Sequence, residues 1–280
     1  MNINQQYANL LRQTLEEGDV LETRNSRVFR NIDTDPIRFD STPLVTVRKT
    51  AVKMALLEME WFLSGDATCP AKLLPWWEKQ LNNEGAYDFG YSDQLRYSTM
   101  YGNPEYFDQI KHILYSLRHH PNSRRHIMTV WNAGEMAHIT KINDNRNTPT
   151  TCHTTLVQWF VRDDELWCNH YQRSADLLLG LPHNWIQHWA LLLYFAYHAG
   201  LQPGQIKWQL GDAHIYHEES HIQAAREIIV GAEDVELPVL TYEYSGGVDD
   251  ALVPTFKAED FTLVGDVPEP VCTIRPKLFE

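Results

Sequence analysis

The sequence has no run of apolar residues near the ~20 that a membrane-spanning helix requires. Its first residues, MNINQQYANLLRQ, also lack the pattern of a secretory signal peptide. It contains only four cysteines in 280 residues, without the spacing of a disulfide framework. Basic residues are outnumbered, with 24 Lys and Arg against 37 Asp and Glu. We therefore expect a cytoplasmic protein with reduced thiols, no membrane segment and no nucleic acid as its main partner.

The acidic balance still allows a small phosphate-bearing ligand, because a few converging arginines can hold one phosphate whatever the net charge. The chain is long enough to bury a sizeable core, and 43% of its residues are hydrophobic. It shows no internal repeat and no low-complexity segment. We expect one domain that spans residues 1–280.

The spacing of apolar residues predicts helices and strands along most of the chain. We expect helices at 4–17, 47–64, 105–119, 186–200 and 217–230, and strands at 126–132, 154–161, 165–174 and 205–216. Residues 75–91 have no such pattern and are expected to be irregular. Pro182 and Gly200 flank the strongly apolar helix 186–200 as capping preferences favour, so we expect that helix to be central.

Chemically versatile residues concentrate in the stretch 149–184. Two predicted strands meet at Asp163 and Asp164, and their pairing would bring Cys152 near Arg173 although the two are far apart in sequence. Nearby arginines would stabilise a thiolate, which is the nucleophilic form of cysteine. The alternative is that Cys152 is a small buried residue without chemistry.

Two further residues allow both a functional and a structural interpretation. Glu58 shares a helical stripe with apolar residues such as Ala55 and Phe62, so it could be a desolvated carboxylate with a raised pKa that moves protons. It could equally be a helix-edge carboxylate paired with a lysine. Asn184 could hydrogen-bond a ligand, or could simply begin a helix.

Four segments together resemble the thymidylate synthases and their phage relatives, the deoxypyrimidine nucleotide hydroxymethylases. They are CH (152–153), YQRSxD (171–176), GLPxN (180–184) and GDAHIY (211–216). The resemblance runs from Tyr7 to the C-terminal tail in the family's order. It implies an α/β (α+β) fold in which a mixed, twisted sheet packs with helices, and a homodimer that forms through the sheet.

The resemblance also implies a reaction. A thiolate adds to C6 of dUMP, and C5 then attacks the methylene group of 5,10-methylenetetrahydrofolate, which is a co-substrate; no metal is expected. The residues implied for catalysis are Cys152, Glu58, Asn184, Tyr91, Asp176 and His153. Those implied for binding the nucleotide are Arg24, Arg173, Ser174, Gln172, Asn184, His214 and Tyr216, with Arg124 and Arg125 reaching across the dimer. Those implied for binding folate are Trp77, Asp176 and Gly180.

Asn184 matches the position at which the family reads the base. A carboxamide can accept a hydrogen bond from N3–H of uracil and donate one to O4, whereas cytosine suits an aspartate. We therefore expect dUMP to be preferred over dCMP.

Several positions depart from the synthase pattern. They are Gln80, Leu95 and His183, together with the loop before Cys152, the C-terminal tail, and the loop around Arg24, which lacks the usual Thr-Gly repeats. Most of these departures would loosen folate or admit water. We therefore expect a dUMP hydroxymethylase, with thymidylate synthase, dCMP hydroxymethylase and a non-catalytic nucleotide or RNA binder as alternatives.

A metal site is a further alternative on spacing alone. His214, His217 and His221 are three and four residues apart, which could place ligands on one helix face. However, His214 falls in a predicted strand, and no acidic or cysteine ligand repeats nearby. The spacing therefore gives only weak support for a metal.

Overall fold

The computed structural model describes residues 1–23, 26–87, 90–100, 103–132 and 154–278. The strands of its main sheet are β1 (Asp19–Glu22), β2 (Arg27–Asn31), β3 (Ile37–Phe39), β6 (Ile127–Thr129), β7 (Thr154–Arg162), β8 (Glu165–Asp176) and β9 (Gln202–Tyr216). In the described residues this sheet has seven strands in the order β1-β2-β9-β8-β7-β6, with β3 also paired to β9. β8 and β9 run parallel and the other pairs antiparallel, so the sheet is mixed.

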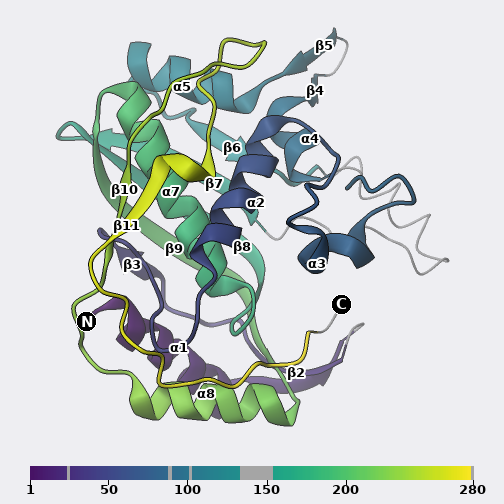
Figure 1. Cartoon of the computed structure of the whole chain (residues 1–280), viewed down its shortest axis with the longest axis vertical. Coiled ribbons are helices and arrows are strands. Elements are labelled where there is room, and N and C mark those ends of the chain that lie inside the picture. The colour runs from purple at the N-terminus through teal and green to yellow at the C-terminus, as the bar shows by residue number, and fades with distance from the viewer. Residues whose placement is uncertain (24–25, 88–89, 101–102, 133–153, 279–280) are drawn as a thin grey trace.

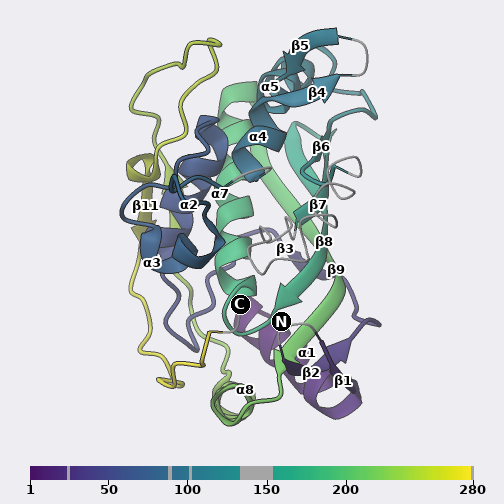
Figure 2. The ribbon, with the colours of Figure 1, turned by 90° about the vertical axis from the view of Figure 1, so that its right-hand side faces the viewer.

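Helices cover one face of this sheet in two layers. The helices are α1 (Ile3–Glu17), α2 (Val52–Ser64), α3 (Leu74–Trp77), α4 (Tyr91–Arg96), α5 (Gln109–His119), α7 (Leu181–Ala199) and α8 (Glu219–Gly231), with short 3-10 turns η1 (Glu78–Gln80) and η2 (Ala258–Asp260). Two small hairpins, β4 (Ser98–Met100) with β5 (Asn103–Phe107) and β10 (Val239–Tyr242) with β11 (Phe261–Val264), complete the described elements. Helix α7 lies against the sheet and α2 lies on the outer side of α7 (Figures 1 and 2).

The central position of α7 follows from its composition. Trp185, Phe195 and most of its other apolar side chains are fully buried. Pro182 lies in its first turn, and Gly200 ends it in a left-handed conformation with φ 74°, which glycine adopts without steric cost. The Gly200 N–H donates to the carbonyl oxygens of Ala196 and Tyr197. The predicted caps and the central position of this helix are confirmed.

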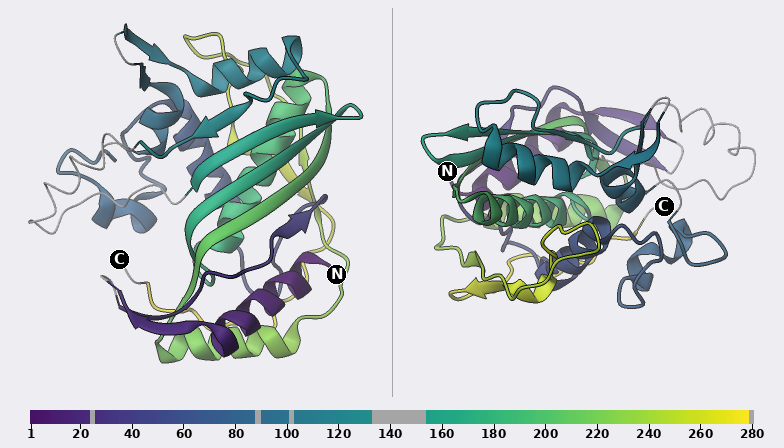
Figure 3. Two further views of the ribbon diagram at one scale, coloured as in Figure 1. Left: turned by 180° about the vertical axis from the view of Figure 1, so that it is seen from behind. Right: turned by 90° about the horizontal axis from the view of Figure 1, so that it is seen from above.

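The opposite face of the sheet is open over β7 and β8. Seen from behind, these strands face the viewer without a described helix in front of them, and α1 and α8 lie at one end of the sheet (Figure 3). Large apolar side chains on this face are exposed, namely Ile127 at 39%, Leu156 at 38% and Tyr171 at 41%. Leu156 and Tyr171 are cross-strand partners. The molecule therefore carries an apolar patch on the outer face of its sheet.

The predicted α/β fold, with a mixed twisted sheet packed with helices, is confirmed. Three segment predictions are wrong in part. The helix predicted at 47–64 begins only at Val52, because Arg48 forms a β-bridge with Cys272 in the tail. The helix predicted at 105–119 begins at Gln109, where the Asp108 side chain caps it by accepting from the Lys111 N–H. The segment expected to be irregular at 75–91 contains the end of α3 and the turn η1.

No helix in the described ranges of the chain is both long enough and apolar enough to cross a membrane.

Candidate active site

Glu58 lies on the inner face of α2, where its carboxylate is almost completely removed from solvent, with the residue 8% exposed. The indole N–H of Trp77 donates a hydrogen bond to Oε1, and the Gln187 amide donates one to Oε2 at 2.5 Å. Burial raises the pKa of this carboxyl from 4.5 to about 7, and the two hydrogen bonds oppose that rise. A carboxyl with a pKa near 7 can both give and accept a proton at neutral pH.

Glu58 stands at one end of a chain of hydrogen-bonded side chains that we call the amide chain. Trp208 Nε1 donates to Gln172 Oε1 at 3.1 Å, and Gln172 Nε2 donates to Asn184 Oδ1 at 3.1 Å. Asn184 Nδ2 donates to Gln187 Oε1 at 3.2 Å, and Gln187 donates in turn to Glu58. The amide chain thus joins the sheet, α7 and α2.

The direction of the amide chain is fixed at the sheet end. An indole nitrogen can only donate, so Trp208 requires the oxygen of the Gln172 amide on its side. The Gln172 nitrogen must then face the other way, where it also donates to the Ser174 carbonyl oxygen at 3.0 Å. The atom of Asn184 that meets this nitrogen must therefore be its oxygen.

The direction is fixed at the helix end as well. The Ala55 carbonyl oxygen can only accept, and Gln187 Nε2 donates to it at 3.3 Å. The Gln187 oxygen therefore faces Asn184 and accepts from it. After these contacts the Asn184 amide still has one N–H and one oxygen lone pair to offer a ligand. Its orientation cannot reverse without breaking the contacts on both sides.

The turn between β8 and α7 is held by Asp176. Its Oδ1 accepts from the backbone N–H groups of Leu178 at 2.9 Å and Leu179 at 3.0 Å. The Gly180 carbonyl oxygen accepts from the Asn184 N–H at 3.1 Å, which begins the helix. Asp176 and Gly180 therefore hold the turn from which Asn184 projects.

The adjacent strand β9 carries His214 and Tyr216. His214 is the parallel register partner of Asp176, so these side chains share one face of the sheet, and its Nδ1 lies 2.9 Å from Asp212 Oδ1. Tyr216 is buried, and its ring centroid lies 5.5 Å from that of His214. Ser174 pairs with Asp212 one step along the same face. The structure thus brings four predicted residues together: Ser174, Asp176, His214 and Tyr216.

The predicted aromatic residues gather beside Glu58. Tyr91 is buried and stacks on Phe62, with ring centroids 4.2 Å apart. Trp77, besides donating to Glu58, packs edge-on against Phe62 at 5.7 Å and against Trp61 at 5.2 Å. Trp77, Tyr91 and Glu58 are therefore positioned by the same face of α2.

The predicted arginines lie in different surroundings. The Arg173 guanidinium carbon lies 5.2 Å from the centroid of the Trp131 ring, which is a cation–π distance. Arg124 and Arg125 are exposed in the turn before β6. Among the described residues, no hydrogen bond or ion pair joins the side chain of Arg124 or Arg125 to the amide chain.

His183, which stands where synthases usually have Phe, binds backbone groups. Its Nδ1 is 2.8 Å from the Leu179 carbonyl oxygen, and the Ala51 N–H donates to Nε2 at 3.1 Å. With one nitrogen donating and the other accepting, the ring is neutral, and burial lowers its pKa to about 4. The Trp76 ring meets it edge-on at 5.1 Å. His183 therefore ties the start of α7 to the start of α2.

Three of the predicted site residues, Arg24, Cys152 and His153, lie outside the described residues. Their roles stay predictions from the sequence. The hairpin expected around them is confirmed from Thr154 onward, where Thr154 pairs with Gln172.

Two members of the amide chain were not predicted. Gln187 follows Asn184 by three residues, which places both on one side of α7, and it is one of the few polar residues in a mostly apolar helix. That combination is a signal the sequence offers. Trp208 gives no comparable signal, because its contact with Gln172 depends on the parallel pairing of β8 and β9.

The three histidines weighed as metal ligands point to different partners. His214 contacts Asp212, His217 stacks on Phe29 at 4.8 Å, and His221 Nε2 is 2.7 Å from the Lys277 carbonyl oxygen. Within the described ranges, no group of three His, Cys, Asp or Glu residues could hold a metal ion.

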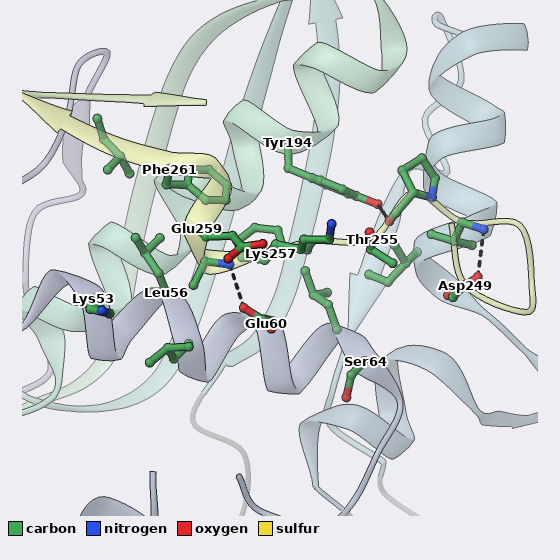
Figure 4. Close-up of a pocket in the computed structure, with 18 of the residues that line it drawn as sticks. Lys53, Leu56, Glu60, Ser64, Tyr194, Asp249, Thr255, Lys257, Glu259 and Phe261 are labelled. Atoms are coloured by element: carbon green, nitrogen blue, oxygen red, sulfur yellow. Dashed lines mark hydrogen bonds between the residues drawn. The ribbon is translucent and has the colours of Figure 1, made fainter. Parts of the chain in front are cut away.

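A cavity of about 920 Å³ lies on the outer face of α2. Figure 4 shows its lining from Lys53, Leu56 and Glu60 of α2, from Tyr194 of α7 and from residues 249–261, with Glu60 accepting from the Ala258 N–H at 2.7 Å. None of the described candidate residues lines this cavity. It is separate from the amide chain.

The chain matches the family model described as "Thymidylate synthase" over residues 5–276. Because this match spans nearly the whole sequence, the protein belongs to the thymidylate synthase family. Enzymes of this family transfer one-carbon units from methylenetetrahydrofolate to C5 of a dUMP-like nucleotide. The protein is thus a folate-dependent one-carbon transferase that acts on a nucleotide.

Proposed function

We propose that this protein is a dUMP hydroxymethylase. It converts dUMP, 5,10-methylenetetrahydrofolate and water to 5-hydroxymethyl-dUMP and tetrahydrofolate. The observation that carries the choice of base is the fixed direction of the amide chain at Asn184. The observations that favour water over hydride lie on the folate side of the site.

In this proposal the predicted residues have the following roles. Cys152 adds to C6 with His153 beside it, Glu58 moves protons through water, and Tyr91 helps remove the C5 proton. The 5′-phosphate is held by Arg24, Arg173, Ser174 and, across a dimer, Arg124 and Arg125. His214 and Tyr216 bind the 3′-hydroxyl, Gln172 orients Asn184, and Trp77, Asp176 and Gly180 border the folate.

Uracil suits the amide that Asn184 presents. The remaining N–H of Asn184 matches the O4 acceptor, and the remaining lone pair of its oxygen matches N3–H. Cytosine presents an acceptor at N3 and a donor at C4, so both contacts would be reversed. Since Gln172 and Gln187 hold the amide in one orientation, reversal would leave buried groups unpaired, at about 1–3 kcal/mol each.

The folate side supports addition of water. His183 offers a polar ring where the synthases have an apolar one, and its contacts with Ala51 and Trp76 commit it to the protein. Gln80 replaces a second tryptophan and is only partly buried. With His183 and Gln80 in place of apolar rings, the folate site binds folate less firmly and excludes water less completely. Both effects favour water as the final nucleophile.

A homodimer through the open sheet face fits the remaining surface. Ile127, Leu156 and Tyr171 form an exposed apolar patch on that face, and Arg124 and Arg125 lie in the turn at its border. A second copy would cover the patch and would receive these arginines at its own phosphate site. The described cysteines Cys69, Cys168 and Cys272 are all unpaired, which supports a reducing, cytoplasmic compartment.

The second candidate is thymidylate synthase, which ends the same reaction with hydride from folate. It is favoured by the retained contact between Trp77 and Glu58 and by the synthase-like run from Tyr171 to Pro182. The two candidates differ only in the fate of the methylene group on C5.

Product analysis tests the proposal directly. The enzyme is incubated with dUMP and 5,10-methylenetetrahydrofolate, the nucleotide product is identified by mass spectrometry, and dihydrofolate is followed by absorbance. We expect 5-hydroxymethyl-dUMP without dihydrofolate. Formation of dTMP with stoichiometric dihydrofolate would make the protein a thymidylate synthase instead.

A further inference from the structure

A small cavity lies beside the amide chain, enclosed by α2, α4, β6, β7 and α7. Its volume is about 20 Å³, and its lining includes Tyr91, Thr154, Gln187 and His188 among apolar side chains such as Leu95. A space of this size can hold one water molecule and is far too small for a nucleotide or a folate. A water there would need two or more polar partners.

Thr154 supplies the first partner. This residue is 3% exposed, and its hydroxyl has no hydrogen-bond partner among the residues that the structure describes. A buried hydroxyl without a partner costs about 1–3 kcal/mol, so a group that satisfies it is expected in the cavity that it lines. Thr154 also follows Cys152 by only two residues in the sequence.

Gln187 supplies the second partner. Its amide nitrogen is committed to Glu58 and to the Ala55 carbonyl oxygen. Its oxygen accepts one hydrogen bond from Asn184, and an amide oxygen has two lone pairs. The second lone pair can accept from a water in the cavity.

His188 does not compete for this water. Its Nδ1 lies 3.1 Å from the Asn184 carbonyl oxygen, and its Nε2 lies 3.1 Å from His170 Nε2. Both ring nitrogens are thus used within the protein, and His188 contributes only ring surface to the cavity.

We propose that this cavity binds one water molecule through Thr154 Oγ1 and Gln187 Oε1, and that this water is the nucleophile that adds to the methylene group. The inference rests on the proposed hydroxymethylase function. It assigns the source of the water to a built site rather than to open solvent. It also gives Thr154 a role in choosing the product.

The step balances without any further reactant. Once tetrahydrofolate has left, C5 carries an exocyclic methylene group conjugated with the C4 carbonyl. The water oxygen bonds to the methylene carbon, the π pair moves through C5 to O4, and the released proton passes to Glu58. The enolate then forms the C5–C6 double bond and expels the Cys152 thiolate.

The location of the cavity suits this step. Gln187, which lines it, contacts both Asn184, the proposed base reader, and Glu58, the proposed proton acceptor. Tyr91, the residue proposed to act at C5, lines it as well. The water therefore lies next to the groups assigned to the base and to proton transfer.

The test compares Thr154→Val, which keeps the shape and removes the hydroxyl, with Thr154→Ser, which restores it. Thr155→Val is the matched control, because Thr155 is the next residue on the strand and does not line the cavity. With enzyme in excess, tritium release from C5 reports the steps before water addition, and mass spectrometry reports hydroxymethyl formation. For Thr154→Val we expect hydroxymethyl formation to slow about tenfold or more.

Under the same conditions, tritium release should stay within about twofold of the wild type, and Thr154→Ser and Thr155→Val should behave like the wild type. Equal rates of hydroxymethyl formation in Thr154→Val and the wild type would overturn the water site. Equal slowing of both readouts would also overturn it, because that indicates a structural role. If the wild type itself makes dTMP, the proposed function fails, and this result is visible before any variant is compared.

Discussion

His183 and Asn184 are neighbours in the first turn of α7, yet they belong to two different regions of the site. Asn184 is held between Gln172 and Gln187 in one orientation that donor-only and acceptor-only groups impose. His183 instead binds the backbone of Ala51 and Leu179 and meets Trp76 edge-on. In the proposed function, Asn184 on the base side belongs to a closed hydrogen-bond network, and His183 on the folate side is a polar residue packed among protein groups.

The difference corresponds to two properties of the proposed enzyme, namely which nucleotide it accepts and which product it forms. A closed network of buried amides discriminates strongly, because a wrong base leaves several groups unpaired. A surface that binds a cofactor by packing changes its affinity in small increments, because each contact contributes little. We infer that the base side fixes the substrate and that the folate side tunes the product.

The largest effect is expected from Asn184→Asp. A carboxylate cannot donate to O4 of uracil, and it faces the Gln187 oxygen that now lacks a donor. We expect kcat/KM for dUMP to fall by about 10⁴-fold, with activity toward dCMP gained. Steady-state kinetics with both nucleotides measures this. Gln223→Glu, at an exposed position of α8, is the control. An unchanged preference for dUMP in Asn184→Asp would contradict the assignment of Asn184 as the residue that reads the base.

Glu58→Gln should lower kcat by about 10²–10⁴-fold, because the amide cannot exchange protons at neutral pH. The measurement is tritium release from C5 of dUMP. Glu60→Gln, two residues along on the outer face of α2, should retain activity within about twofold. Comparable losses in both variants would mean that the helix rather than the carboxylate matters.

The same substitution should reveal the linkage between Glu58 and stability. Because the folded-state pKa of Glu58 is raised from 4.5 to about 7, the contribution of Glu58 to folding is most favourable below pH 4.5 and is lost as pH rises to about 7. Relative to the wild type, Glu58→Gln should therefore gain on the order of 3 kcal/mol between pH 4.5 and pH 8. Urea unfolding across this range measures the gain, and a constant difference would contradict the raised pKa.

Gln187→Leu should shift the pH profile. The Gln187 hydrogen bond opposes the rise in the pKa of Glu58, so its removal raises that pKa further above about 7. The pH at which the ionised carboxylate becomes available then moves upward by on the order of one unit. A kcat profile from pH 5 to 9 detects the move, with the exposed Gln223→Leu as control. A profile shifted to lower pH would contradict the network.

The smallest effect is expected from His183→Phe, which restores the synthase residue. The variant loses the acceptor for the Ala51 N–H, at about 1 kcal/mol of stability. We expect dTMP to appear as a minor product of the variant, because an apolar ring packs better against folate. Mass spectrometry detects it beside 5-hydroxymethyl-dUMP. A variant that makes no dTMP would contradict the role assigned to His183.

Much of the fold was predictable because its signals are local. Alternating apolar residues marked the hairpin of β7 and β8, and Pro182 and Gly200 marked both ends of α7. The first residues of α2 and α5 were not predictable. The start of α2 depends on a bridge from Arg48 to Cys272 in the tail, and the start of α5 depends on the cap at Asp108.

The candidate site was predictable as a set of residues but not as a network. The motifs around Arg173 and Asn184 predicted which residues face the base, and helical spacing predicted that Glu58 lies among apolar side chains, where the structure buries it. The contacts of Glu58 with Trp77 and of Gln172 with Trp208 join residues 19 and 36 positions apart, so no sequence period encodes them. The unpaired hydroxyl of Thr154 likewise depends on the packing of several elements.

A competition experiment tests the choice of nucleotide and the choice of product together. Wild-type enzyme receives equal amounts of dUMP and dCMP with 5,10-methylenetetrahydrofolate, and all nucleotide products are identified by mass spectrometry. The account predicts 5-hydroxymethyl-dUMP as the dominant product, with dCMP left unconverted. Hydroxymethyl-dCMP would contradict the assignment of the base side, and dTMP would contradict that of the folate side.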